Sequence, residues 1–284
     1  MSALATLTLS GAVSLSSAAM LLVGAATLLA CLLIAAPYGR YSGDASQLWG
    51  VKLPPKMAWI LMESPNLWMI FITLYLGAWT VSVTEESDYY NVKASSTPLP
   101  SVYALALPNR ILLGCFLAHY VHRTIIFPLN LHEKSSRMPI SVAMLAFSYC
   151  LWNSFTQIGS IFTDVSKKDS DVYSFQFIAG IALFFAGMFV NIQSDYILLG
   201  LRRSRDKTSS RGGYSIPTGA LYRYVSCPNY LGEICEWAGF AVAAGSLSAV
   251  AFCAYTVGTR PPMSLAPLPS SLSFLPRLPL PTSP

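Results

Sequence analysis

The sequence has 284 residues, of which 54% are hydrophobic and only 11% are charged, against roughly 25% charged residues in an ordinary soluble protein. A soluble chain of this length would need far more charge on its surface, so the composition excludes that class and predicts an integral membrane protein. The net charge of +5 does not predict a nucleic-acid partner, because the basic residues lie in short segments between apolar stretches, where they set membrane topology.

The N-terminal region predicts a membrane span that is kept in the mature protein. No residue from Met1 to Gly39 is charged, and the stretch from Leu21 to Ala36 is strongly apolar. A cleaved signal peptide normally has a basic start and a shorter apolar core. We therefore expect a retained first span, with a signal anchor as the alternative.

Six apolar stretches have about the length of roughly 20 residues that a helix needs to cross a bilayer. Backbone hydrogen bonds must be satisfied within each span in lipid, so the spans are predicted to be helices. The predicted fold class is all-α, one polytopic bundle of about six transmembrane helices formed by residues 1–257. The predicted spans are Ala12–Ala36, Met57–Val83, Val102–Leu129, Met138–Thr163, Val172–Leu199 and Leu231–Val257.

The connecting segments predict an orientation in the membrane. Lys and Arg outnumber Asp and Glu in the first, third and fifth connections, and the fifth, from Arg202 to Arg211, is the most basic. Positive charge favours the cytoplasmic side. These three connections are therefore expected in the cytoplasm, and the N-terminus is expected on the other side.

The C-terminal segment differs from everything before it. Residues 258–284 are rich in Pro, Ser and Leu. So many prolines are incompatible with a helix, and the composition is typical of an extended or disordered segment. We expect a tail that is separate from the membrane domain.

The cysteines predict neither a disulfide framework nor a metal site. They occur singly, mostly in apolar stretches, without a CxxC or Cys/His ligand spacing. Buried packing residues are the expected role. The cysteines are Cys31, Cys115, Cys150, Cys227, Cys235 and Cys253.

Polar residues inside the spans are the candidates for function, because ionisable groups in a bilayer are costly. The predicted topology brings those of four spans to the cytoplasmic end of the bundle, beside the most basic connection. This convergence predicts one site at that end. The residues are Glu63, His119, Tyr120, His122, Arg123, Asn191, Asp195, Asn229, Glu233 and Glu236.

Structural roles are the alternatives for these residues. Arg123 can extend to the lipid headgroups, the two histidines can be hydrogen-bonded packing residues, and Asn191 and Asp195 can join helices. The basic segment 202–211 can set topology, bind anionic lipid, or hold a phosphate group through its guanidinium groups.

Five segments resemble the steroid 5-alpha-reductase family, over roughly Ala36 to Thr256. The MESPNLW and VSCPNY motifs are more similar to the plant-type, brassinosteroid-pathway members than to the animal ones. The segments are APYGRYSG (36–43), AWILMESPNLW (58–68), HYVHRTIIFPL (119–129), GMFVNIQSDYILLGLR (187–202) and GGYSIPTGALYRYVSCPNYLGEICEWAGF (212–240).

This resemblance implies an enzyme of the endoplasmic reticulum membrane that uses NADPH to reduce the Δ4 double bond of a 3-oxo-Δ4 steroid taken from the lipid. It implies that Glu63 and Tyr120 hold and polarise the C3 carbonyl and that Trp237 lines the steroid pocket. No metal is implied. The cofactor-binding positions that it implies are Asn191, Asp195, Arg202, Tyr214, Asn229 and Glu233.

The sequence after Gly258 departs from the family pattern. The resemblance would imply a further C-terminal helix and a basic, aromatic segment that closes over the cofactor, and residues 258–284 contain nothing of that kind. Two alternatives therefore stand beside the steroid reductase. One is a related reductase for a polyprenol or enoyl-CoA substrate, and the other is a truncated, inactive membrane protein.

Overall fold

The structure is a computed structural model, which describes most of the chain. Side chains are not described for residues 2–9, 30–33, 103 and 202–208. The described residues are 2–33, 50–73, 75, 102–132, 135–208 and 217–259.

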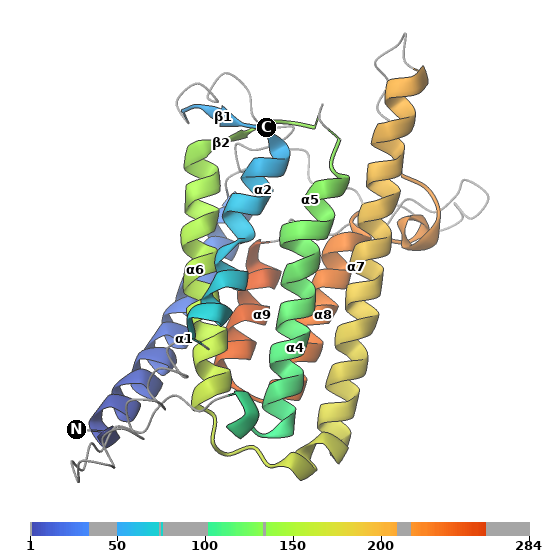
Figure 1. The fold of residues 1–284 in the computed structure, drawn as a ribbon. Helices are drawn as coiled ribbons and strands as arrows, with labels where there is room; N and C mark the ends of the chain where they lie inside the picture. Colours follow the sequence, from blue (N-terminus) through green and yellow to red (C-terminus); the bar gives the residue numbers. More distant parts are fainter. Residues whose placement is uncertain are drawn as a thin grey trace.

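The described residues form one helical bundle (Figure 1), which confirms the predicted all-α class. Three helical segments within it, Ser10–Leu29, Leu107–Asn130 and Phe175–Leu201, are long and apolar enough to cross a membrane. The helices are α1 (Ser2–Leu33), α2 (Pro55–Glu63), α4 (Leu107–Val121), α5 (Phe127–Asn130), α6 (Ile140–Thr163), α7 (Phe175–Thr208), α8 (Pro228–Ala244) and α9 (Leu247–Thr259).

Short helical turns and one strand pair complete the described elements. Helix α2 is followed, after a turn at Ser64, by helical residues 65–73. The other elements are η3 (Val102–Ala104), the π-helical η4 (His122–Ile126), η5 (Asp169–Tyr173), η6 (Ala220–Arg223), β1 (Lys52–Leu53) and β2 (Met138–Pro139).

The last predicted span is wrong as a single helix. Residues 231–257 fold as most of α8 and most of α9, and the two helices are separated at Gly245, which has a φ of 60°. A left-handed glycine at this position is a common helix end. The chain then reverses, so that Trp237 of α8 lies against Phe252 of α9 with ring centroids 4.4 Å apart. Hydropathy misses this break because neither Gly245 nor Ser246 carries a charge.

Helix α9 also extends past the expected start of the tail. It continues through Gly258 to Thr259, so only residues 260–284 of the predicted tail remain, and these lie outside the described residues. Helix α7 likewise runs beyond its predicted end at Leu199 to Thr208. Its charged last turns rise above the rest of the bundle in Figure 1, which explains why hydropathy ended the helix too early.

Two of the connections predicted to lie in the cytoplasm meet at one end of the bundle. Strand β1 of the first pairs antiparallel with β2 of the third, with Lys52 opposite Pro139 and Leu53 opposite Met138. The C-terminal end of α7, where the fifth connection begins, lies at the same end in Figure 1. The charge pattern therefore grouped these connections correctly, and their cytoplasmic location stays a prediction.

Helices α7 and α8 touch backbone to backbone. Glycines seven residues apart on each helix face one another, at 180 and 187 on α7 and at 232 and 239 on α8. A Cβ atom on Gly187 would overlap the backbone of Gly232 and Glu236, and one on Gly232 would overlap the backbone of Asn191. Small residues allow this close approach in membrane helices. The contact fixes which polar residues of the two helices become neighbours.

The third span has a π-helical segment where a proline enters the helix. Pro128 has no N–H to donate, and its ring would clash with the carbonyl of Thr124 in a regular α-helix. The turn from His122 to Ile126 widens to π-helical geometry and the helix continues to Asn130. Such segments are frequent at functional sites, and this one directly follows Tyr120.

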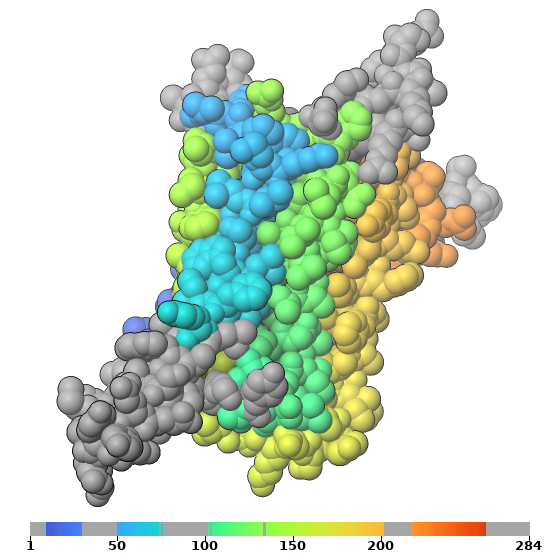
Figure 2. Space-filling view, in the orientation of Figure 1, coloured from blue at the N-terminus to red at the C-terminus, as the bar shows by residue number. Residues whose placement is uncertain are grey.

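An aromatic core lies between α4, α7, α8 and α9. Phe116, Phe184, Trp237 and Phe240 are each at most 2% exposed. On the face drawn in Figure 2, the described parts of α2, α4 and α7 lie side by side as one surface.

Candidate active site

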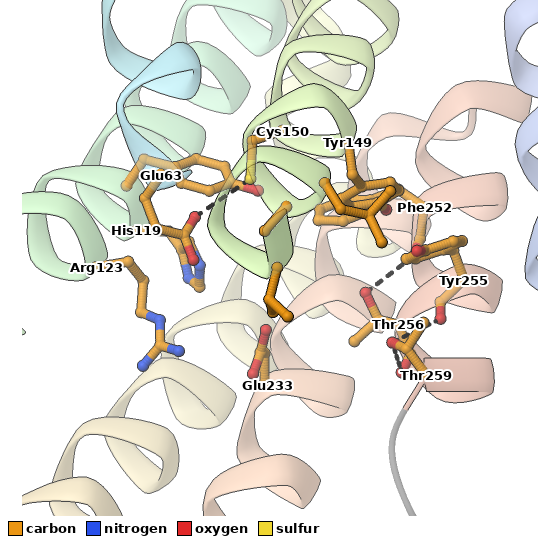
Figure 3. A pocket seen from close by; sticks show the side chains of 14 residues that line it. Glu63, His119, Arg123, Tyr149, Cys150, Glu233, Phe252, Tyr255, Thr256 and Thr259 are labelled. Carbon is orange, nitrogen blue, oxygen red and sulfur yellow. Dashed lines mark hydrogen bonds between the residues drawn. The ribbon is translucent and has the colours of Figure 1, made fainter. Parts of the chain in front are cut away.

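A cavity of about 320 Å³ lies between α2, α4, α6, α8 and α9. Its ionisable side chains gather at one part of the wall, whereas Tyr149, Tyr255 and Thr256 lie at another (Figure 3). The cavity is lined by Glu63, His119, Tyr120, Arg123, Val142, Leu145, Ala146, Tyr149, Cys150, Glu233, Phe252, Tyr255, Thr256 and Thr259.

Glu63 is the last residue of α2 and points its carboxyl group into the cavity. Its Oε2 accepts a weak hydrogen bond from the thiol of Cys150 on α6, with 3.7 Å between sulfur and oxygen (Figure 3). Its backbone carbonyl accepts hydrogen bonds from the side chains of Thr124 at 3.3 Å and Asn66 at 3.4 Å. The end of α2 is thereby tied to the π-helical turn of the third span.

Tyr120 is 4% exposed and its ring is held among other rings. The ring centroids of Phe116, His119 and Trp237 lie 4.6, 4.8 and 5.9 Å from that of Tyr120. Its hydroxyl oxygen accepts a hydrogen bond of 3.1 Å from the side-chain amide of Asn153 on α6. Both the plane of the ring and the hydroxyl group are therefore fixed by contacts.

Helix α6 sets the spacing of the two predicted catalytic groups. Cys150 and Asn153 lie one turn apart on this helix, where residues at i and i+3 share a face. One contacts the Glu63 carboxyl group and the other the Tyr120 hydroxyl group. The carboxyl and phenol groups thus enter the cavity from α2 and α4, and both are braced by α6.

His119 and Glu236 form a buried pair across α4 and α8. Nδ1 of His119 lies 2.8 Å from Oε1 of Glu236, and their side chains are 5% and 1% exposed. The His119 ring packs edge-on against Trp237, with centroids 4.6 Å apart. Oε2 of Glu236 has no hydrogen-bond partner within the part of the chain that the structure describes. Because Nδ1 of His119 faces Glu236 on α8, the pair fixes the orientation of the imidazole ring.

Arg123 joins the cavity to the polar residues of α7 and α8. Its Nη1 donates to Oδ2 of Asp195 at 2.9 Å, and its guanidinium lies 4.7 Å from the ring centroid of Trp59 and 4.8 Å from that of Phe127. A guanidinium between aromatic faces and a carboxylate is a strongly held cation. Arg123 is therefore a fixed positive charge at the edge of the cavity.

Amide groups complete this network. Asn229 donates through Nδ2 to Oδ1 of Asp195 at 3.2 Å, and Asn191 donates through Nδ2 to the backbone carbonyl of Asn229 at 2.9 Å. The glycine contact between α7 and α8 makes these bonds possible, because Asn191 lies one turn after Gly187 and Asn229 one turn before Gly232 on the touching faces.

The structure brings most of the predicted site residues together. Glu63, Tyr120 and Glu233 line the cavity, and Asp195 reaches it through Arg123. Trp237 packs behind the wall, against two lining residues, Tyr120 and Phe252. Of the remaining predicted positions, the side chain of Arg202 and the whole of Tyr214 lie outside the described residues.

Asn153 and Cys150 are site residues that sequence reasoning missed. Both lie in the fourth predicted span, which carries no charge and therefore offers no ionisable candidate for a site. A signal was nevertheless present, because Cys150, Asn153 and Gln157 recur at helical spacing and mark one polar face of α6.

A cavity with this lining defines a class of protein: a membrane-embedded protein with room for an apolar ligand that has a polar group at one end. Residues 136–266 match the family model described as 3-oxo-5-alpha-steroid 4-dehydrogenase. Plant and mammalian proteins match over most of their length.

Two relatives illustrate the extent of this match. Steroid 5-alpha-reductase DET2 of Gossypium hirsutum is 35% identical over 236 residues, which cover 81% of this chain and 79% of the relative. The 3-oxo-5-alpha-steroid 4-dehydrogenase 1 of Rattus norvegicus is 34% identical over 226 residues, which cover 80% and 75%. The chain belongs to the steroid 5-alpha-reductase family, and it is an oxidoreductase of the 3-oxo-5-alpha-steroid 4-dehydrogenase type.

Proposed function

We propose that this protein reduces the Δ4 double bond of a 3-oxo-Δ4 steroid to the 5α-product with NADPH, in the endoplasmic reticulum membrane. One observation carries the proposal: the carboxyl group of Glu63 and the hydroxyl group of Tyr120 line the same cavity. The names of the relatives supply the substrate class. The alternation of loop charge supports a cytoplasmic site.

Tyr120 stabilises the charge that the reaction creates. NADPH, when bound, would supply a hydride equivalent to C5, and electron density would shift from the C4–C5 double bond toward the C3 carbonyl oxygen. A hydrogen-bond donor aimed at this oxygen lowers the energy of the resulting enolate. The Tyr120 hydroxyl is such a donor, and its ring cannot swing away because Phe116 and Trp237 pack against it.

Glu63 holds the same carbonyl group from the other side. Its carboxyl group comes from a different helix and is anchored by Cys150 and by the contacts of its backbone carbonyl. In its protonated form it donates a second hydrogen bond to the C3 oxygen. Water then supplies the proton that C4 takes up.

The donor set next to the cavity fits a dinucleotide phosphate. Arg123 and the amide groups of Asn191 and Asn229 provide donors, while Asp195 and Glu233 provide acceptors for ribose hydroxyl groups. We propose that these residues hold NADPH together with Arg202 and Tyr214. The segment 202–211 contributes the positive charge that a 2′-phosphate needs.

The apolar part of the cavity suits a steroid that enters from the lipid. Val142, Leu145, Ala146 and Phe252 line it, and Leu145 is 70% exposed on the surface of the bundle. A planar hydrocarbon ligand gains free energy from burial against such a wall. Its oxygen would then lie at the end where the ionisable groups gather.

An assay on the full chain in microsomes or nanodiscs tests this proposal. With NADPH and progesterone, a 3-oxo-Δ4 steroid, we expect the 5α-dihydro product by mass spectrometry. A polyprenol and an enoyl-CoA serve as competing substrates. Reduction of either of these without reduction of the steroid would contradict the proposal, as would the absence of any reduction.

The basic segment after α7 yields a separate prediction. Reversing the charge at Arg202, Arg203 and Arg205 to Glu should raise the KM for NADPH about tenfold or more, with little change in the KM for steroid, because a cationic partner of the phosphate is lost. The preference for NADPH over NADH should fall with it.

The matched control reverses charge at the opposite end of the bundle. Lys167 and Lys168 lie there, where Lys167 donates to the backbone carbonyl of Ala244 at the end of α8. Their replacement by Glu should leave the KM for NADPH unchanged. An unchanged NADPH preference in the arginine variant would show that segment 202–211 serves topology alone.

A further inference from the structure

We propose that Asn153 is a positioning residue for the reduction, because it holds the Tyr120 hydroxyl group so that the phenol proton faces the substrate. This inference rests on the proposed function. It starts from the 3.1 Å hydrogen bond that the Asn153 Nδ2 group donates to the Tyr120 oxygen.

Burial of the Asn153 side chain costs free energy unless its amide group forms hydrogen bonds. It is 0% exposed and lies near the middle of α6, inside a span without charge. A buried amide in an apolar environment destabilises a protein unless hydrogen bonds compensate. The bond from Nδ2 reaches a residue 33 positions away on another helix, so it joins α6 to α4 at the catalytic group.

The direction of this bond determines what the phenol group can do. A phenol has one proton to donate and an oxygen that accepts. Since the amide N–H occupies an acceptor position of the oxygen, the Tyr120 proton remains for the C3 carbonyl oxygen of the substrate. A tyrosine whose proton pointed to an acceptor on the protein would lose this donor function.

The other atom of the amide group supports the same role. Oδ1 of Asn153 has no hydrogen-bond partner among the residues that the structure describes. The amide is therefore held at this contact through its donor, which bonds to the Tyr120 oxygen. If the amide were reversed, Oδ1 would accept the Tyr120 proton and withdraw it from the substrate.

The donor also matters as charge develops. When hydride adds to C5, electron density shifts from the C4–C5 double bond to the C3 oxygen, and the Tyr120 O–H bond is polarised toward that oxygen. Negative charge then grows on the phenol oxygen, and the amide N–H faces this charge. A second donor behind the first strengthens the chain of hydrogen bonds.

A double-mutant cycle tests whether Asn153 acts through Tyr120. Asn153→Leu removes the donor and keeps the number and branching of the side-chain heavy atoms. In the full chain with NADPH and progesterone, we expect kcat to fall about tenfold or more, with the KM for both substrates changed less than about threefold. In a Tyr120→Phe background the same substitution should cost nothing further, because the group it positions is absent. Losses that multiply would overturn the proposal.

Gln157→Leu is the matched control. Gln157 is a buried amide one turn further along α6, 1% exposed, and it donates to the backbone carbonyl of Ser248 instead of to a catalytic group. Its loss removes a similar helix-joining hydrogen bond, so it should lower thermal stability while kcat stays near the parent value. If both variants lower kcat equally, Asn153 has only a structural role.

A measurement that needs no turnover separates this inference from the proposed function. Progesterone labelled with ¹³C at C3 is bound without cofactor, and the carbonyl stretching frequency is measured by infrared difference spectroscopy. We expect a downshift in the parent, a smaller downshift in Asn153→Leu and in Asn153→Ala, and the smallest in Tyr120→Phe. An unchanged downshift in both Asn153 variants overturns the positioning role. If the parent shows a downshift but no turnover, only the proposed reduction fails, and if it binds no steroid, both proposals fail.

Discussion

Tyr120→Phe should lower the rate of steroid reduction by about 10²–10³, the effect of removing one preorganised donor from an oxyanion site. Glu63→Gln should lower the rate as well, because an amide N–H is a weaker donor than a carboxyl O–H. Both groups line the cavity, from α4 and from α2. Each substitution changes one polar group and almost no volume. The loss should therefore appear in kcat, measured from single-turnover formation of the 5α-product, while the bundle stays folded.

The two variants are also expected to differ from one another. Tyr120→Phe removes the hydroxyl group to which the Asn153 amide donates, so the amide loses this hydrogen bond. Glu63→Gln keeps a group that accepts from Cys150. Tyr120→Phe should thus be the less stable of the two in thermal unfolding. Turnover of both variants within about twofold of the parent would contradict the assignment of these residues to the oxyanion site.

Gly187→Leu should abolish NADPH binding and destabilise the bundle. A side chain at this position would overlap the backbone of Gly232 and Glu236. Backbone atoms of a packed helix cannot yield as a flexible side chain can, so the helices must separate. Overpacking of this kind costs about 3 kcal/mol or more. We expect a lower melting temperature in nanodiscs and loss of the network between Asn191, Asp195 and Asn229.

Gly200→Leu is the control for this prediction. It lies on the same helix and replaces the same residue type, but nothing is within 4 Å of a Cβ atom built at Gly200. The substitution should leave the melting temperature and NADPH binding close to those of the parent. If Gly187→Leu behaved in the same way, the backbone contact between α7 and α8 would not be what holds the cofactor residues together.

Composition was enough to predict the class of protein, and charge was enough to group the connections that meet at one end of the bundle. The cost of ionisable groups in lipid is a property of single residues, so Glu63, Arg123 and Asp195 could be selected without knowing their neighbours. Spans follow from local hydropathy for the same reason. The break at Gly245 was not predicted, because a turn between two apolar helices changes the backbone angles and not the hydropathy.

Only the tertiary structure decided which groups meet. Three contacts depend on the rotation and approach of helices that are far apart in sequence. They are Asn153 with Tyr120, His119 with Glu236, and Arg123 with Asp195. The α7–α8 approach comes from glycines that fit only against each other's backbone, and the direction of the third span after Tyr120 comes from a π-helical turn. Each of these contacts is made by the surfaces of two helices. The residue pattern along one helix describes only one of the two surfaces, so it cannot predict the contact.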